Sequence, residues 1–126
     1  MSSSTGGNLR IINATNKHWR RTDLQGWDIS QEIPENIPVG TNQTYHYEFN
    51  SSDAQGTAAY LFTDTEQSFQ IHAVGNQGIW IEIKCLGQFK FSNRKNEEII
   101  RVGFIENGCV GFVISGTYPD FQIFTF

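Results

Sequence analysis

Apolar and polar residues alternate along most of this chain, and apolar residues at helical spacing are not apparent. In the segment from Thr44 to Phe49, the aromatic residues fall on one face and Thr44, His46 and Glu48 on the other. This alternation is typical of an antiparallel sheet with one buried and one solvated face. The pattern predicts strands at Asn8–Thr15, His18–Thr22, Thr44–Phe49, Thr57–Thr63, Ser68–Val74, Ile79–Leu86, Glu98–Ile105, Cys109–Ser115 and Phe121–Phe126.

Glycine, proline and asparagine mark the predicted connections between these strands. We expect a loop over Asp28–Gly40, because Pro34 and Pro38 cannot donate hydrogen bonds within a central ladder. Within it, Pro38-Val39-Gly40 predicts a turn that leads into the next strand. Two further segments predict hairpins, namely Gly75-Asn76-Gln77-Gly78 and Glu106-Asn107-Gly108.

Length and strand spacing together predict a single all-β domain. A chain of 126 residues is long enough for one hydrophobic core. About nine or ten strands joined by short turns predict a two-sheet antiparallel β-sandwich, and no repeat of fixed period indicates a propeller. We expect the sandwich to cover residues 8–126, with residues 1–7 as a flexible tail.

The amino-acid composition and net charge limit the kinds of partner that this protein is expected to bind. Hydrophobic residues make up 38% and charged residues 17% of the chain, and the net charge is −4. Nucleic-acid binding requires clustered Lys and Arg, and only His18–Arg21 is densely basic, so we expect no nucleic-acid partner. Residues 1–7 lack the features of a secretory leader, which predicts a cytoplasmic location or leaderless secretion.

Residues able to carry catalysis or bind metal are scattered. No nucleophile elbow, phosphate-binding glycine loop or zinc-protease helix motif occurs. His46 and His72 are predicted on polar faces, and would form a site with Glu48 only if their strands paired. Cys85 and Cys109 are predicted to be buried thiols, with a disulfide left open. We therefore predict no catalytic residues, no metal site and no cofactor.

Aromatic residues beside basic ones are the main indication of binding. Trp80 falls on a polar face, where an exposed tryptophan indicates a partner, a sugar or a membrane interface. Trp19 lies within the basic segment and Trp27 in the loop that follows it, and either ring is also compatible with a place in the core. The predicted ligand-binding residues are Trp19, Arg20, Arg21, Trp80 and Tyr118.

The order of segments in the first half resembles a known family. A strand ending Ile11-Ile12-Asn13-Ala14-Thr15 precedes a basic aromatic strand, a Pro38-x-Gly40 turn and Gly56-Thr57-Ala58-Ala59-Tyr60. This order resembles the aegerolysins and, more broadly, the actinoporin-like cytolysins and fungal fruit-body lectins. The resemblance implies a small acidic β-sandwich that recognises a membrane lipid or a glycan, in some members with a larger pore-forming partner.

Three functions follow as hypotheses. The first is a non-enzymatic recognition domain for a membrane lipid headgroup or a glycan. The second is a small-molecule binder or acid-base enzyme of isomerase or cyclase type, with Tyr45, Tyr47, His72 and Glu82 lining a pocket between the sheets. The third is an assembly role, in which the aromatic segment Phe121–Phe126 pairs at the edge of a homo-oligomer.

Overall fold

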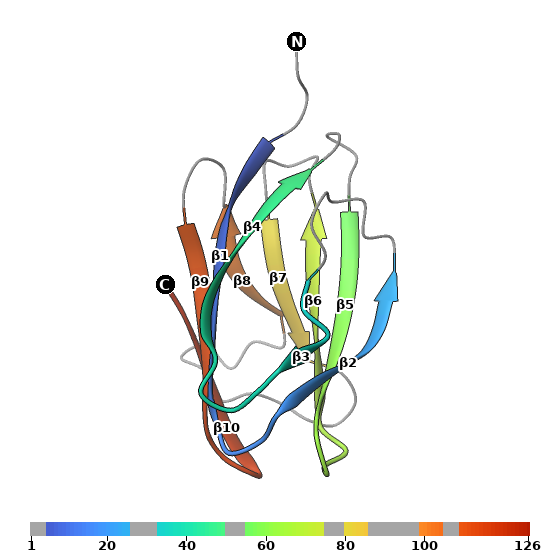
Figure 1. Ribbon diagram of the computed structural model, residues 1–126, viewed down its shortest axis with the longest axis vertical. Helices are drawn as coiled ribbons and strands as arrows, with labels where there is room; N and C mark the ends of the chain where they lie inside the picture. Colours follow the sequence, from blue (N-terminus) through green and yellow to red (C-terminus); the bar gives the residue numbers. More distant parts are fainter. Residues whose placement is uncertain (1–4, 26–32, 50–54, 75–79, 86–98, 105–108) are drawn as a thin grey trace.

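The protein is a sandwich of two β-sheets (Figure 1). The computed structural model describes residues 5–25, 33–49, 55–74, 80–85, 99–104 and 109–126. The four-stranded sheet contains, in spatial order, β10 Asp120–Thr125, β9 Cys109–Thr117, β1 Thr5–Thr15 and β4 Asn42–Phe49. The six-stranded sheet contains β3 Asn36–Ile37, β2 Trp19–Gln25, β5 Gln55–Phe62, β6 Ser68–Val74, β7 Trp80–Cys85 and β8 Ile99–Phe104.

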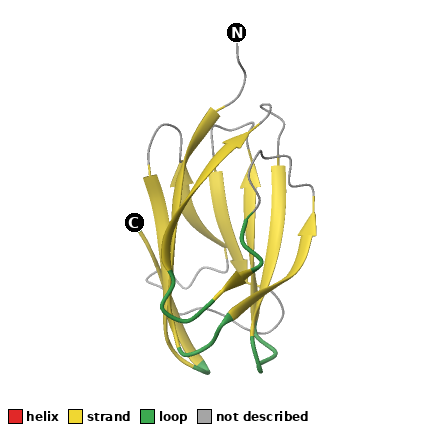
Figure 2. Cartoon of the chain, viewed as in Figure 1, coloured by secondary structure: helices red, strands yellow, loops and turns green. Residues whose placement is uncertain are grey.

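The predicted fold class is confirmed: the described residues form strands and turns and contain no helix (Figure 2). Every predicted strand is present, with ends that differ by a few residues at most. Neighbouring strands are antiparallel with one exception, because β1 and β9 run parallel from Asn8 opposite Cys109 to Thr15 opposite Gly116. A parallel pair cannot be joined by a tight turn, and here the whole six-stranded sheet lies between the two strands in sequence.

The predicted hairpin between β8 and β9 is wrong. Strand β8 pairs with β7 in the six-stranded sheet, whereas β9 pairs with β1 and β10 in the four-stranded sheet. The chain therefore crosses from one sheet to the other between these strands. The turn residues 105–108 and the predicted hairpin turn at 75–78 lie outside the described residues. A turn motif specifies a change of direction, but not which strand the chain then pairs with.

Two boundaries also differ from the prediction. Strand β1 begins at Thr5 rather than Asn8, because residues 5–7 continue the antiparallel ladder to β4, with Thr5 opposite Phe49. The predicted loop contains the two-residue strand β3, which pairs with β2 at the edge of its sheet. Its position between Pro34 and Pro38 follows from the restriction of proline to sheet edges.

The core lies between the sheets and is rich in aromatic side chains. Trp19 of β2 stacks on Phe112 of β9 from the facing sheet, with ring centroids 6.3 Å apart and ring planes at 7°. Phe62 and Phe121 meet across the same space at 4.4 Å. Alternate positions of β5 and β6 face this core, and five of their side chains are fully buried: Ala58, Tyr60, Phe62, Phe69 and Ile71.

Candidate functional site

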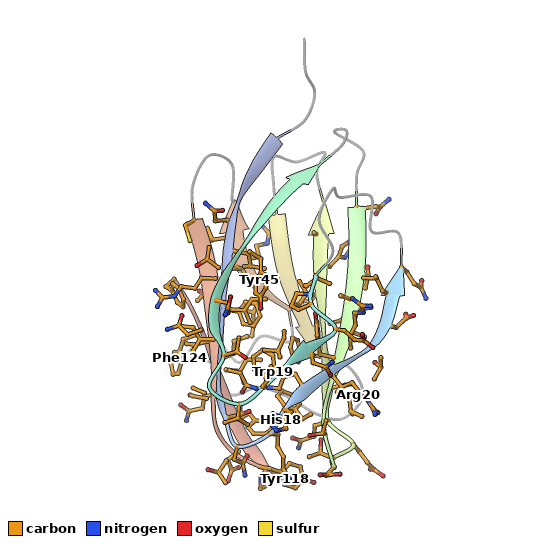
Figure 3. All side chains as sticks on the ribbon, in the orientation of Figure 1. His18, Trp19, Arg20, Tyr45, Tyr118 and Phe124 are labelled. Atoms are coloured by element: carbon orange, nitrogen blue, oxygen red, sulfur yellow. The ribbon has the colours of Figure 1, made fainter. Side chains whose placement is uncertain are left out.

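Four connections meet at one end of the sandwich, which we call the turn end. It consists of the β1–β2 loop (residues 16–18), the β3–β4 turn (38–41), the β5–β6 turn (63–67) and the β9–β10 turn (118–119). The β1–β2 loop is bonded to the other three. Val39 N donates to His18 Nδ1 at 3.0 Å, Thr63 N donates to His18 O at 2.9 Å, and Tyr118 N donates to Asn16 Oδ1 at 3.0 Å. Figure 3 shows His18 and Tyr118 at this lower end.

A buried asparagine fixes the loop that holds the turn end together. Asn13 has no exposed surface, and its Nδ2 donates to the carbonyls of Lys17 at 3.0 Å and Ile37 at 2.9 Å. Its Oδ1 accepts from the backbone N of Thr15 at 3.0 Å and from the Thr15 hydroxyl at 2.7 Å. The amide thus makes the four hydrogen bonds that it is able to make. The position of the β1–β2 loop is therefore set by a satisfied polar group in the interior.

The turn end carries two exposed apolar side chains, one of which lies next to a cation. Tyr118 is 43% exposed and Val39 is 47% exposed. The Lys17 Nζ lies 5.7 Å from the centroid of the Tyr118 ring, within the range of a cation–π interaction. Val39 is held outward by its turn, in which Thr41 N donates to Pro38 O and Gly40 adopts a φ of 87° that favours glycine.

Acidic residues lie in the adjacent β5–β6 turn. Asp64 and Glu66 are both exposed, and Asp64 has a φ of 63°, a conformation that aspartate tolerates in turns. Lys17 and the nearby Arg20 bring positive charge to the same region of the molecule. The turn end is therefore a surface of mixed charge with two exposed apolar side chains.

The structure corrects the assignment of Trp19 as a ligand contact. Its side chain is fully buried, with Phe62 at 5.9 Å and Phe69 at 5.3 Å, and Figure 3 shows it between the sheets. Trp19 Nε1 lies 3.4 Å from the Thr15 hydroxyl, which supplies a partner for its donor. Trp19 can be buried within a basic segment because successive residues of a strand point to opposite faces of the sheet. Trp19 faces the core, whereas His18 and Arg20 on either side of it face solvent.

Arg20 and Arg21 do not form a pair around one ligand. Successive strand residues point to opposite faces, so Arg20 is exposed while Arg21 is half-buried. The Arg21 guanidinium donates to the carbonyl of Ile33 at 2.8 Å, and its backbone N donates to Glu35 O. Arg21 therefore fastens the segment that precedes β3, and Arg20 alone stays available to a ligand.

Tyr60 binds the same segment as Arg21. Its hydroxyl donates to the carbonyl of Pro34. Burial raises the pKa of Tyr60 well above its usual value of 10.0, and the positive charge of Arg21 partly opposes that shift. Burial also raises the pKa of Tyr45, which is partly buried against the core. Both phenol groups therefore keep their protons at neutral pH.

The histidines considered for an acid-base or metal site are not brought together. His46 belongs to β4 and His72 to β6, which lie in different sheets, so the condition under which they would form a site with Glu48 is not met. His72 lies between the buried residues Ile71 and Ala73 and therefore points away from the core. Its register partner is Glu82 in β7. The described residues contain no cluster of three or more His, Cys, Asp or Glu able to hold a metal ion.

The remaining predicted residues divide into three groups. Tyr118 is exposed at the turn end, as a ligand contact must be. Trp80 begins β7 opposite Val74 and Phe104, but its side chain lies outside the described residues, as does Trp27. Cys109 is a free and exposed thiol, which corrects its predicted burial, because it starts β9 at the margin of the sheet.

Sequence reasoning missed two residues of the turn end. Lys17 contacts Tyr118 although 100 residues separate their loops in the chain, and no local pattern predicts that contact. The exposure of Val39 could have been predicted from the sequence. An apolar residue between Pro38 and Gly40 in a tight turn has no neighbouring strand to cover it.

Comparison with known proteins adds no assignment: no protein-family model and no curated protein matches the sequence. Within the described part of the chain, no helix has the length and apolar character of a membrane span.

Proposed function

We propose that this protein is a non-enzymatic recognition domain that binds a membrane lipid headgroup or a glycan through its turn end. The observation that carries the proposal is the exposure of Tyr118, beside the Lys17 ammonium, and of Val39 on turns that are hydrogen-bonded to the β1–β2 loop, which Asn13 anchors from the interior. Fixed loops lower the entropy lost when a ligand is bound.

The contacts follow from the chemistry of these side chains. The Tyr118 ring and the Val39 side chain enter the apolar boundary of a membrane, or pack on the apolar face of a sugar ring. Lys17 and Arg20 bind phosphate or carboxylate oxygens as charged donors. Asp64 and Glu66 add negative charge close by, so a zwitterionic headgroup matches this surface better than a strongly anionic one.

Trp80 remains a predicted contact from a second position. The Trp80→Ala variant is expected to weaken binding and to keep a cooperative thermal transition. Loss of that cooperative transition would assign the ring to the core instead.

The test is co-sedimentation with vesicles of phosphatidylcholine and sphingomyelin, with and without sterol, beside phosphatidylserine vesicles and a glycan array. The wild type is expected to bind the zwitterionic vesicles or one glycan class. Tyr118→Ala and Val39→Ser are expected to lower that affinity by about tenfold each, because each removes an apolar contact.

The matched control is Ile99→Ser on β8, where the side chain is 45% exposed and outside the turn end. It removes a similar apolar surface and is expected to leave binding unchanged. Absence of binding to all vesicles and glycans would overturn the proposal, as would an equal loss in Ile99→Ser and Val39→Ser.

A further inference from the structure

The outer face of the four-stranded sheet, which points away from the core, carries two exposed phenylalanines. Phe124 is 48% and Phe126 is 52% exposed, and Figure 3 shows Phe124 at the outer margin of this sheet. Side chains alternate along β10, and Phe121 and Ile123 are buried in the core, so Phe124 lies on the outer face. A contiguous exposed apolar patch indicates a binding surface, whereas a single exposed ring does not.

The strand register places Phe124 in an apolar row that crosses the sheet. Phe124 lies opposite Val113 of β9, and Val113 lies opposite Ile12 of β1. Both residues are half-buried and alternate with fully buried core residues, so they share the outer face with Phe124. Adjacent strands lie about 4.8 Å apart, so the row from Ile12 to Phe124 spans about 10 Å. Phe124 is therefore part of a contiguous apolar row.

A single cation lies beside this row. Arg10 is exposed and precedes Ile12 by two residues on β1, so the two side chains share the outer face. Arg10 is the only lysine or arginine in the four strands of this sheet. Its Nε donates to Asn42 Oδ1 at 2.8 Å, and its Cζ lies 5.7 Å from the centroid of the Phe126 ring. Two contacts thus hold the guanidinium at the border of the apolar row.

The contact with Phe126 depends on a glycine. A Cβ at Gly111 would come within 2.7 Å of the Phe126 ring, so only a residue without a side chain lets the ring lie directly on the sheet. Backbone hydrogen bonds in both directions between Phe126 and Gly111, at 2.9 Å and 2.8 Å, fix this position. The guanidinium is therefore positioned before a ligand arrives, which lowers the entropy lost on binding.

The terminal nitrogens of Arg10 are available to a ligand. Asn42 takes up Nε, and within the described part of the chain no carboxylate forms an ion pair with Arg10. The two terminal nitrogens form a planar fork that matches the two oxygens of a carboxylate. One carboxylate carries one negative charge, which the single Arg10 balances, whereas a phosphate monoester carries about −1.5 to −2 at pH 7. The charge of this face therefore favours a monocarboxylate.

We propose that this face is a binding site for a monocarboxylate with an alkyl chain, of the fatty-acid class. The carboxylate accepts hydrogen bonds from the terminal nitrogens of Arg10, and the chain lies over Ile12 and Val113 toward Phe124. A row of about 10 Å accommodates a chain of medium length, such as that of octanoate. A sugar ring fits less well, because these three apolar side chains supply no hydrogen-bond partner for its hydroxyls.

The test is a titration of the intact chain, labelled with nitrogen-15, followed by its backbone amide NMR signals. The probes are octanoate, octanol and octylammonium, which share one chain length. Octanoate is expected to shift the signals of Arg10, Gly111 and Phe124 and to bind about fivefold more tightly than octanol, the upper range for an exposed ion pair. Octylammonium is expected to bind more weakly than octanol. Hexanoate, two methylenes shorter, is expected to bind about fourfold more weakly than octanoate, since a half-covered methylene contributes about twofold.

Two variants separate the charge from the apolar row. Arg10→Gln is expected to lower the affinity for octanoate to that for octanol and to leave octanol binding unchanged. Phe124→Ser is expected to weaken the binding of both probes by the same factor. The matched control is Arg101→Gln, which removes an exposed arginine from β8 of the other sheet and should change neither affinity. Circular dichroism melts verify that each variant is folded.

Equal affinities of the wild type for octanoate and octanol would overturn the proposal. So would a loss of octanoate affinity in Arg101→Gln as large as that in Arg10→Gln, or octanoate shifts confined to the turn end. Signals of this face that change on dilution of the protein alone would assign the face to a second copy and would overturn the proposal as well. The proposed function is tested on vesicles and glycans through Tyr118 and Val39, so either result can fail without the other.

Discussion

The buried and the exposed aromatic side chains of this protein differ in what surrounds them. Trp19 lies within 6.3 Å of the Phe62, Phe69 and Phe112 ring centroids and has no exposed surface. Tyr118 lies 6.3 Å from Phe121 on one side and meets Lys17 on another, with 43% of its surface exposed. Buried rings contribute to stability through removal of apolar area from water, whereas an exposed ring leaves that area available to a partner. Substitutions in the two groups should therefore separate folding from binding.

The largest effect is expected in the core. Trp19→Ala removes a ring that bridges the two sheets and leaves a cavity, which should lower the free energy of unfolding by about 3 to 5 kcal/mol. Urea denaturation followed by circular dichroism measures this loss. Trp19→Phe keeps most of the apolar volume and should lose clearly less. A Trp19→Ala protein of wild-type stability would contradict the assignment of this ring to the core.

The next effect concerns the polar group that joins the core to the turn end. Asn13→Ala leaves the Thr15 backbone N and the carbonyls of Lys17 and Ile37 without their amide partner. The expected loss of stability is about 1 to 3 kcal/mol, because buried polar groups lose their hydrogen bonds. Asn16→Ala, in the exposed part of the same loop, serves as the control and should lose less. Binding at the turn end should weaken in Asn13→Ala even where the protein is folded, since the loop loses its anchor.

A smaller effect is expected from pH. Burial gives Tyr60 a higher pKa in the folded protein than the ordinary 10.0 of the unfolded chain. Below pH 10 both states hold the proton and stability is complete, whereas above it the unfolded state releases the proton first and is favoured. Stability should thus fall as pH rises above about 10, by at most about 1.4 kcal/mol per pH unit from this group.

Denaturation midpoints measured in steps of pH on either side of 10 test that slope. Tyr60→Phe removes the titrating hydroxyl and should flatten the slope, although it also loses the hydrogen bond to Pro34 O. Tyr45 contributes in the same direction, because burial raises its pKa as well. An identical slope in wild type and Tyr60→Phe would show that this hydroxyl is not the group responsible.

The smallest effect on stability is expected from the exposed rings. Tyr118→Ala and Phe124→Ala should each change the free energy of unfolding by less than about 0.5 kcal/mol, as is usual for surface positions. Thermal melts of both variants beside Trp19→Ala measure the contrast. A loss of stability comparable with that of Trp19→Ala would show that these exposed rings contribute to stability as core residues do.

Local pattern was enough to predict most of the fold. The strands β4, β5 and β6 and the turn at Pro38-Val39-Gly40 lie where the sequence predicts them. The candidate site was predicted less completely. Tyr118 and Arg20 are exposed as expected, but Trp19 is core and Arg21 binds the carbonyl of Ile33. Strict alternation over residues 18–21 would have separated His18 and Arg20 from Trp19 and Arg21.

The sequence by itself determined the all-β class, the strands and most of their faces, because the period of two is a property of the extended backbone of each strand. Only the tertiary structure decided that β8 and β9 belong to different sheets, that β1 lies parallel to β9, and that Lys17 meets Tyr118. These features join segments far apart in the chain. They depend on which apolar faces cover each other when the sheets pack. The alternation within one strand specifies its buried face but does not specify the strand with which it pairs.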